Sequence, residues 1–490
     1  MRMKTLDVRK IVLIFPPHWD TPAPPLGISY ISAFLRCKGF EVKQMDLNHR
    51  FRDRYNLSDN DLYVEVKKII SENPDVIGIS MGHTNFKYSI KLMKLIKKQI
   101  PDVFVIAGGS HISYIGKKII GDFPDLFDIG VFSEGEETVF EILQKKMNGE
   151  KLVNITGTII RGKNGTAVRN PPRHPLYDVD DIPFPDFDDF PLYEYPLPIL
   201  PMLTSRGCIK ACSFCGFIGS QVAGGYRERS IDNVINEIKR NTDNYKCKIF
   251  LVGDALINAN PKRLMRLCDR IIKEDINIYW LAEAFPNLNR ELCEKMYKAG
   301  CRFLWISPET GSSITANKMN KGVALDRAKI SIRNAKNAGI FTSVWFILGF
   351  PTETKNDLEM TINYARRLKN YIDECSFVPF HLMVGSPAYQ SPHEYNIKKI
   401  ENNRYEMFSS FHREKKMVSK FEIMKYCERL WDEFNLDLRF NFEVEKGIFF
   451  ERLRFDKRTL LKLISRDHFD KKKREYKYED LFRKALQDVI

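Results

Sequence analysis

Three cysteines close together in the chain have the types and the spacing of a metal-binding loop. Cys208, Cys212 and Cys215 follow the pattern C-x-x-x-C-x-x-C, and Phe214 stands directly before the last of them. Thiolates spaced so tightly can converge on an iron–sulfur cluster or on zinc. A structural zinc site normally has four protein ligands, but no fourth Cys or His lies near this loop in the sequence. The loop therefore favours a four-iron cluster with one open iron; zinc with a remote fourth ligand, or three buried structural cysteines, are the alternatives.

The cysteine loop resembles the signature of the radical S-adenosylmethionine (SAM) enzymes, which also place an aromatic residue where Phe214 stands. The resemblance implies that Cys208, Cys212 and Cys215 bind a [4Fe-4S] cluster whose open iron chelates SAM. It also implies that reduction of the cluster cleaves SAM to give a 5′-deoxyadenosyl radical. The electron would come from a donor such as flavodoxin or ferredoxin.

The loop follows the first of six strand-and-helix units between residues 200 and 389. Six units are too few to close an eight-stranded barrel, so we expect a partial (β/α)6 barrel with its chemistry at the carboxyl ends of the strands. The expected strands cover residues 200–205, 248–252, 277–282, 303–307, 341–348 and 374–380, and the expected helices cover residues 231–242, 261–273, 290–299, 325–338 and 354–368.

Polar and glycine residues follow several of these expected strands. Gly253 and Asp254 follow the second, Glu309 follows the fourth, and Gly349 follows the fifth. In register with the cysteine loop, they resemble the SAM-binding motifs of the family. The resemblance implies that Glu309 binds the ribose hydroxyls and that Gly349 lets its strand approach the adenine. It places Gly253 and Asp254 near the SAM amino group, although the family usually has Glu where Asp254 stands.

Residues 1–150 alternate between short β-rich segments and amphipathic segments, which predicts a doubly wound, Rossmann-like α/β domain. Ligands of such sheets bind beyond the carboxyl ends of the strands. No G-x-G-x-x-G motif follows the first expected strand, which argues against a dinucleotide. The expected strands cover residues 10–15, 41–46, 76–81, 103–107 and 129–132, and the expected helices cover residues 26–38, 61–72, 88–99, 112–121 and 136–147.

Parts of this domain resemble the cobalamin-binding domain that precedes many radical SAM modules. The segments that carry the resemblance are residues 16–27, 108–111 and 134–138. The resemblance implies that cobalamin lies over the carboxyl edge of the sheet. The residues that it implies as contacts are Ser80, Gly108, Gly109 and Gly135.

One segment departs from those cobalamin proteins in which a histidine ligates cobalt from below. Asn48 stands where their D-x-H-x-x-G motif has the histidine, and Phe51 stands where it has glycine. His49, His83 and His111 are candidates to reach the cofactor, but a histidine at a loop end is more often a hydrogen-bonded part of the scaffold. The resemblance also permits cobalamin without a protein ligand below the cobalt.

The remaining segments connect and follow the two domains. Residues 151–199 form the expected linker, with a β-hairpin over residues 153–169 and a proline-rich stretch after it. Residues 390–490 have helical periodicity, as in residues 421–434, and we expect a small helical domain that caps the barrel.

The composition is that of a globular protein, with 43% hydrophobic residues. No apolar run is long enough to cross a bilayer and no signal-peptide core follows the first residues, so we expect a cytoplasmic protein. The cysteines outside the loop are scattered, which indicates a reducing compartment. The net charge of +14 comes from basic residues spread over the whole chain, so we do not expect a nucleic-acid partner.

The two resemblances together imply a cobalamin-dependent radical SAM enzyme. Our leading hypothesis is methyl transfer to an unactivated carbon of a small molecule or a peptide. Radical cyclisation or rearrangement with the same cofactors is the alternative, because the motifs serve both outcomes. An RNA-modifying methylthiotransferase would need three N-terminal cysteines for a second cluster, whereas residues 1–150 contain only Cys37. A cobalamin carrier without activity would leave the cysteine loop without a purpose. The sequence identifies neither the substrate nor a catalytic residue.

Overall fold

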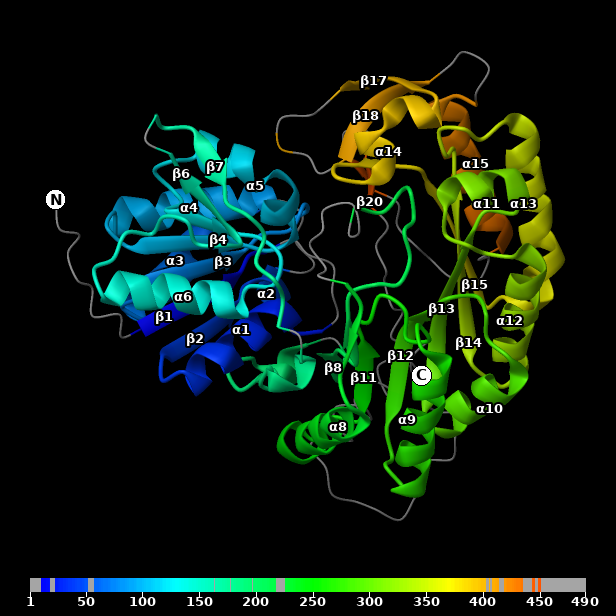
Figure 1. Ribbon diagram of the computed structural model, residues 1–490, viewed down its shortest axis with the longest axis horizontal. Helices are drawn as coiled ribbons and strands as arrows, with labels where there is room; N and C mark the ends of the chain where they lie inside the picture. The colour runs from blue at the N-terminus through cyan, green and yellow to red at the C-terminus, as the bar shows by residue number, and fades with distance from the viewer. Residues whose placement is uncertain are drawn as a thin grey trace. The chain divides into compact units, whose positions relative to one another are not determined.

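The chain forms two compact units in the computed structural model (Figure 1). Unit 1 comprises Met1–Tyr195, Gly216–Gly224 and Asn402–Ser409, and unit 2 comprises Pro196–Cys215, Gly225–Glu401 and Ser410–Ile490. The structure describes residues 10–17, 23–51, 57–162, 164–176, 178–195, 197–216, 225–401, 405, 408–413, 418–434, 443–445 and 448–450.

The sheet of unit 1 has the strand order β2-β1-β3-β4-β5-β6-β7. Its strands are β1 (Lys10–Phe15), β2 (Glu41–Asp46), β3 (Val76–Ser80), β4 (Phe104–Gly108), β5 (Ile129–Val131), β6 (Thr158–Arg161) and β7 (Ala167–Arg169). Strands β1 to β5 pair in parallel, and β6 and β7 add to them in antiparallel fashion. The four inner residues of β1 are at most 4% exposed, because helices cover both faces of a parallel sheet.

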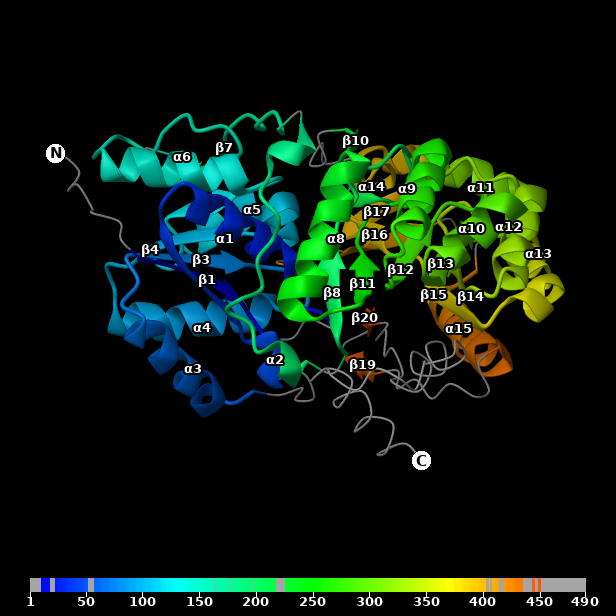
Figure 2. The same ribbon diagram turned by 90° about the horizontal axis from the view of Figure 1, so that it is seen from below.

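The helices of unit 1 lie on both faces of this sheet, with α3 and α4 on one face and α1 and α6 on the other (Figure 2). They are α1 (Leu26–Cys37), α2 (Asn48–Phe51), α3 (Asp59–Ser71), α4 (Phe86–Gln99), α5 (Ser110–Asp122) and α6 (Glu136–Met147). The predicted Rossmann-like fold is confirmed, and each predicted strand lies within one residue of its observed bounds.

The segment that follows β7 is bound to unit 1 by acidic side chains. Arg36 donates to Asp186 at 2.7 Å and to Asp189 at 2.6 Å. The hydroxyl of Tyr195 donates to the carboxylate of Asp46 at 2.5 Å. The hairpin that the sequence analysis assigned to the linker forms β6 and β7 and so extends the sheet of unit 1.

The sheet of unit 2 has the order β15-β14-β13-β12-β11-β8, and all neighbours pair in parallel. Its strands are β8 (Ile199–Met202), β11 (Ile249–Val252), β12 (Tyr279–Ala284), β13 (Cys301–Glu309), β14 (Phe341–Leu348) and β15 (Glu374–Pro379). Since the strands follow one another in chain order without closing, this is the predicted partial barrel.

Helices connect consecutive strands of this sheet. They are α8 (Ile231–Tyr245), α9 (Pro261–Lys273), α10 (Arg290–Lys298), α11 (Ser313–Met319), α12 (Leu325–Asn337) and α13 (Lys355–Leu368). Side chains of Ser230, Asn260 and Thr354 accept backbone hydrogen bonds and so fix where α8, α9 and α13 begin. In the described ranges, no helix has both the length and the apolar character needed to cross a membrane.

The C-terminal part contains strands as well as the expected helix. A small sheet has the order β16-β18-β17, formed by β16 (Leu382–Met383), β18 (Phe408–Arg413) and β17 (Ile397–Glu401). Helix α15 (Lys420–Phe434) agrees with the prediction for residues 421–434 and packs against β15. Two short strands, β19 (Glu443–Glu445) and β20 (Ile448–Phe450), pair with each other. The helical prediction for residues 451–490 lies outside the described residues.

Candidate active site

The cysteine loop follows β8, which is the outermost strand on one side of the unit 2 sheet. The loop begins with two short paired strands. Strand β9 (Ser205–Arg206) pairs with β10 (Arg227–Glu228) in antiparallel fashion. Gly207 has a φ of +85°, and a Cβ at this position would lie 2.0 Å from the carbonyl oxygen of Gly225. Only glycine permits this approach, so Gly207 sets the direction in which the chain reaches the cysteines.

The middle of the cysteine loop is bound to the end of α11. The amide of Ser213 donates to the carbonyl of Met319 at 2.9 Å. The side-chain amide of Asn320 donates to the carbonyl of Ala211 at 3.0 Å. These hydrogen bonds lie on either side of Cys212, which is buried, whereas the other two cysteines of the loop are partly exposed.

Cys208 and Cys215 lie near enough to Cys212 to influence the pKa of its thiol. Among the residues that the structure describes, no group of three His, Cys, Asp or Glu side chains has the geometry of a single-ion site. Burial raises the pKa of Cys212 to about 12, so a metal that binds there must displace a proton.

Asp254 binds the chain just before the cysteine loop. One carboxylate oxygen accepts from the amide of Thr204 at 2.6 Å. The other accepts from the hydroxyls of Thr204 at 2.6 Å and Ser205 at 2.7 Å. The amide of Gly253 donates to the carbonyl of Met202 at 2.8 Å, which continues the pairing of β11 with β8. The structure thus gives both oxygens of Asp254 partners at the start of the cysteine loop.

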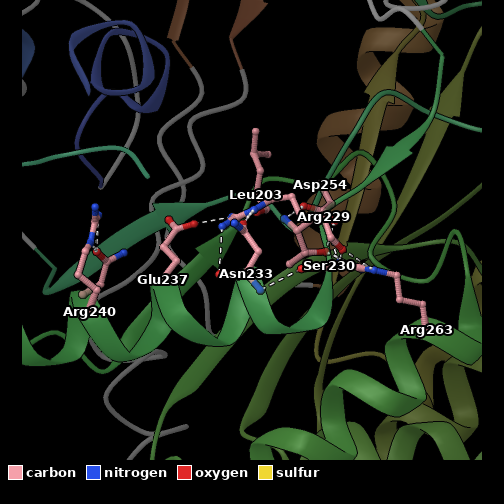
Figure 3. Close-up of polar contacts among 10 residues, drawn as sticks. Leu203, Arg229, Ser230, Asn233, Glu237, Arg240, Asp254 and Arg263 are labelled. Carbon is pink, nitrogen blue, oxygen red and sulfur yellow. Dashed lines mark hydrogen bonds and ion pairs between the residues drawn. The ribbon is translucent and has the colours of Figure 1, made fainter. Parts of the chain in front are cut away.

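Arg263 on α9 forms further hydrogen bonds with Thr204. Its guanidinium donates to the carbonyl of Thr204 at 2.9 Å and to the hydroxyl at 3.2 Å. It also donates to the carbonyl of Arg229, which in turn forms a buried ion pair with Glu237 on α8. Figure 3 shows Arg229, Asp254 and Arg263 approaching one another from different elements. The sequence analysis did not identify Arg263, which gives no signal beyond its place in a helical pattern.

Glu309 ends β13 in a strained backbone conformation. Its φ is +70°, where residues other than glycine are uncommon, and the register between β13 and β14 shifts just before it. Such strain clusters at functional sites. Its carboxylate lies 2.5 Å from the ammonium of Lys321, and both side chains are buried. Glu309 therefore lies at the strand end where the sequence analysis expected the ribose ligand.

Lys321 is a buried cation among acidic groups, and the sequence analysis missed it. Burial lowers the pKa of Lys321, but the carboxylates of Glu309 and Glu283 raise it by more, so the ammonium stays charged. Burial raises the pKa of Glu283, on β12, to about 7. Glu283 could have been found as a charged residue within an apolar strand, whereas Lys321 lies after a short helix and gives no such signal.

Gly349 turns the chain at the carboxyl end of β14. Its φ is +80°, and a Cβ would lie 3.0 Å from Ile423 on α15 and 3.2 Å from Arg413 on β18. Its amide donates to the carboxylate of Glu353 at 2.5 Å. Burial raises the pKa of Glu353 to about 8. Because Gly349 has no side chain, α15 and β18 can approach this strand end. The sequence analysis expected the adenine of SAM at the same strand end.

The carboxyl ends of neighbouring parallel strands share one edge of a sheet. The cysteine loop follows β8, Asp254 follows β11, Glu309 ends β13 and Gly349 follows β14. The structure therefore brings all of the predicted cluster and SAM residues to the same edge of the unit 2 sheet.

The residues predicted to contact cobalamin lie at the corresponding edge of unit 1. Ser80 and Gly108 are direct partners in the register of β3 and β4. Gly109 follows with a φ of +94°, and a Cβ there would lie 2.4 Å from the carbonyl oxygen of Met81. Gly135 directly precedes α6. This edge is thus lined by backbone and small residues, which lets a large cofactor approach closely.

The histidines near this edge differ in their bonding. His49 has partners for both ring nitrogens, the carbonyl of Asp46 at 2.6 Å and the carboxylate of Glu194 at 3.2 Å. His111 is fully buried, and neither ring nitrogen has a hydrogen-bond partner of standard geometry among the described residues. Burial, and then nearby His83, lower the pKa of His111 to about 3, so its ring is neutral. A hydrogen bond to the backbone of Tyr405 opposes this decrease in the pKa of His111.

Comparison with known proteins agrees with this division of the chain. The model of the radical SAM superfamily matches residues 202–365, and that of the B12 binding domain matches residues 19–143. An uncharacterized methyltransferase of Pyrococcus horikoshii is 29% identical, over 74% of this chain and 79% of its own length. An anaerobic magnesium-protoporphyrin IX monomethyl ester cyclase of Rubrivivax gelatinosus is 24% identical, over 70% of this chain and 62% of its own length.

Among solved structures, the cobalamin-dependent SAM radical enzyme OxsB, with aqua-cobalamin and SAM bound, has a similar fold. Its TM-score is 0.71 at 16% sequence identity, and the alignment covers 88% of this chain and 67% of that chain. At 16% identity, the likeness shows a similar fold. Because the alignment covers 88% of this chain, it includes at least part of both sheets described above.

Proposed function

Since the chain belongs to the cobalamin-binding radical SAM enzymes, with a [4Fe-4S] cluster, SAM and cobalamin as its cofactors, we propose that it transfers a methyl group to an unactivated carbon of a small molecule or a peptide. When bound, the cluster and SAM supply a radical that removes a hydrogen atom from the substrate, and cobalamin supplies the methyl group. One observation carries the proposal of methyl transfer: the likeness to a protein named as a methyltransferase extends over 74% of the chain.

In this proposal the residues at the edge of the unit 2 sheet bind the cluster and SAM. The thiolates of Cys208, Cys212 and Cys215 would hold three irons and leave the fourth open to SAM. The ammonium of Lys321 opposes the increase that burial gives to the pKa of Glu309, and the charged carboxylate could accept hydrogen bonds from both ribose hydroxyls. Gly349, which has no side chain, would let the strand end approach the adenine.

The edge of the unit 1 sheet would bind cobalamin through backbone and small side chains. Ser80, Gly108 and Gly109 offer a hydroxyl and close-lying backbone to the nucleotide tail of the cofactor. His111, held neutral by burial, can donate one hydrogen bond and accept another. His49 is already bonded at both ring nitrogens, so we do not assign it to the cobalt.

The test is anaerobic reconstitution with iron, sulfide and hydroxocobalamin, followed by addition of reduced flavodoxin and SAM that carries a labelled methyl group. The proposal predicts S-adenosylhomocysteine, with the label retained by the corrinoid until a substrate accepts it. Formation of 5′-deoxyadenosine without S-adenosylhomocysteine would overturn methyl transfer. Cys212→Ala should abolish 5′-deoxyadenosine formation, whereas Cys37→Ala, at an exposed position on α1, should leave it unchanged.

Radical cyclisation is the second candidate function. The observation that favours it is the likeness to a protein named as a cyclase, which at 24% identity covers 70% of this chain. This chain spans less than two thirds of that relative's length. The labelled-methyl experiment separates the two functions, because cyclisation needs no transfer of the label.

A further inference from the structure

Thr204, four residues before Cys208, has all of its polar atoms bonded to residues that are distant in the sequence. Its amide and its hydroxyl donate to Asp254, each at 2.6 Å. Its hydroxyl also accepts from Arg263 at 3.2 Å, and its carbonyl accepts from the same guanidinium at 2.9 Å. The amide of Arg229 donates to that carbonyl at 3.1 Å. Thr204 is only 2% exposed, so no water can replace these bonds without a rearrangement.

The groups that bind Thr204 come from three different elements. Asp254 follows β11, Arg263 lies in the first turn of α9, and Arg229 precedes α8 (Figure 3). The hydroxyl of Thr204 lies between the carboxylate and the guanidinium, since it donates to one and accepts from the other. A rotation of the backbone at Thr204 would therefore leave several buried polar groups unsatisfied, which is costly in a protein interior.

The charged groups of this network have partners within the protein. Arg229 forms a buried ion pair with Glu237, and Arg263 lies 3.8 Å from the carboxylate of Glu228. The carboxylate of Asp254 accepts three hydrogen bonds from Thr204 and Ser205, which occupy three of its about four lone-pair sites.

The bonds at Thr204 act on the cysteines through a short and constrained segment. Ser205 and Arg206 pair with β10, and Gly207 contacts the backbone of Gly225. Between Thr204 and Cys208 the chain thus has little freedom, so a displacement at Thr204 is passed on to the first cluster ligand.

We propose that Asp254 and Arg263 are positioning residues, which fix the entry of the cysteine loop through Thr204 and thereby set the position of the cluster relative to SAM. Asp254 is then not a ligand of the SAM amino group. The inference rests on the cluster and SAM site of the proposed function, but it does not depend on methyl transfer.

The test compares variants that remove the same hydrogen bonds by changing either Thr204, which donates them, or Asp254, which accepts them. Thr204→Val removes the hydroxyl at constant shape, Thr204→Ser keeps it, and Asp254→Asn replaces one acceptor oxygen by an amide nitrogen that can only donate. Three quantities are measured in the reconstituted protein: the EPR spectrum of the reduced cluster without SAM, the SAM dissociation constant, and the rate of 5′-deoxyadenosine formation. Tryptophan fluorescence serves as the control for folding, because Trp280, Trp305 and Trp345 lie in strands of unit 2.

The proposal predicts that Thr204→Val and Asp254→Asn alter the EPR spectrum and lower the rate in the same way, with SAM affinity within about twofold of wild type. Combining them should be no worse than Asp254→Asn alone, and Thr204→Ser should behave as wild type. Arg263→Met should resemble Thr204→Val. These results do not require the methyl label to move, so failure of methyl transfer remains a separate outcome.

The opposite pattern would overturn the proposal. A ligand of the SAM amino group would give, in Asp254→Asn, a loss of SAM affinity of about tenfold or more with an unchanged EPR spectrum in the absence of SAM. In that case Thr204→Val would have wild-type properties. If Asp254→Asn does not fold, the comparison of Thr204→Val with Thr204→Ser decides, because a spectrum that is identical in both refutes the role of the hydroxyl.

Discussion

Replacement of Lys321 by Met removes a buried cation and leaves Glu309 without its partner. The two side chains are 8% and 9% exposed, and their charged atoms lie 2.5 Å apart. Removal of one partner from a buried ion pair costs about 3–5 kcal/mol, because the remaining charge has neither water nor a counter-ion. We expect Lys321→Met to lower the free energy of unfolding by about this amount at alkaline pH.

The loss of stability should depend on pH with a definite sign. Burial raises the pKa of Glu309, and in Lys321→Met no ammonium opposes that increase. A carboxyl group whose pKa is higher in the folded than in the unfolded state destabilises the fold at pH values above its unfolded pKa, which is about 4.3. The difference between the variant and wild type should therefore grow as the pH rises from the folded pKa of Glu309 in wild type, which burial already raises, to its higher folded pKa in the variant.

The assay is urea unfolding followed by tryptophan fluorescence, because Trp280, Trp305 and Trp345 all lie in the unit 2 sheet. The double variant Lys321→Met/Glu309→Gln should recover most of the lost stability, since no buried charge remains. Lys318→Met, at an exposed position on the preceding helix, is the matched control. Equal unfolding midpoints for Lys321→Met and wild type at alkaline pH, or a defect that does not vary with pH, would refute the reasoning.

Three further predictions follow from local geometry. Gly207→Ala should lose bound iron, because its Cβ would lie 2.0 Å from a carbonyl oxygen, whereas Gly165→Ala, also at positive φ but with no atom within 4 Å, should keep it; equal iron contents would contradict this. Burial raises the pKa of Glu353 to about 8, so wild-type stability should fall as the pH rises from about 4.3 to about 8, and Glu353→Gln should flatten that fall in thermal melts. Parallel melting curves would count against it. Tyr195→Phe removes the 2.5 Å hydrogen bond to buried Asp46 and should cost about 1–3 kcal/mol, and an unchanged melting temperature would be inconsistent with that bond.

The inner strands of both sheets could be predicted from sequence because they are largely buried on two faces, as in β1 and β4. A short apolar run such as Ile11 to Ile14 is typical of a strand in a parallel sheet that helices cover on both faces. Strands β17 and β18 were missed because Ile397–Glu401 and Phe408–Arg413 are short and rich in polar residues, and their pairing depends on neighbours far along the chain.

Some residues of the site could likewise be predicted from local sequence patterns, whereas others depend on contacts between segments that are distant in the sequence. The three cysteines, Glu309 and Gly349 stand at positions that a local pattern marks. The bond between Arg263 and the carbonyl of Thr204 joins residues 59 positions apart, and no pattern in either segment specifies which carbonyl a guanidinium will bind. Lys321 was missed for the same reason, since its role depends on the carboxylates that the fold places around it.

The central claim is that Cys208, Cys212 and Cys215 hold a [4Fe-4S] cluster with one iron open to SAM. The most direct test is the EPR spectrum of the anaerobically reconstituted and reduced protein, measured before and after addition of SAM. Our account predicts the signal of a reduced [4Fe-4S] cluster whose g-values shift when SAM binds, and its loss in Cys212→Ala. A protein that carries only zinc at these thiolates, or a cluster signal that SAM leaves unchanged, would contradict it.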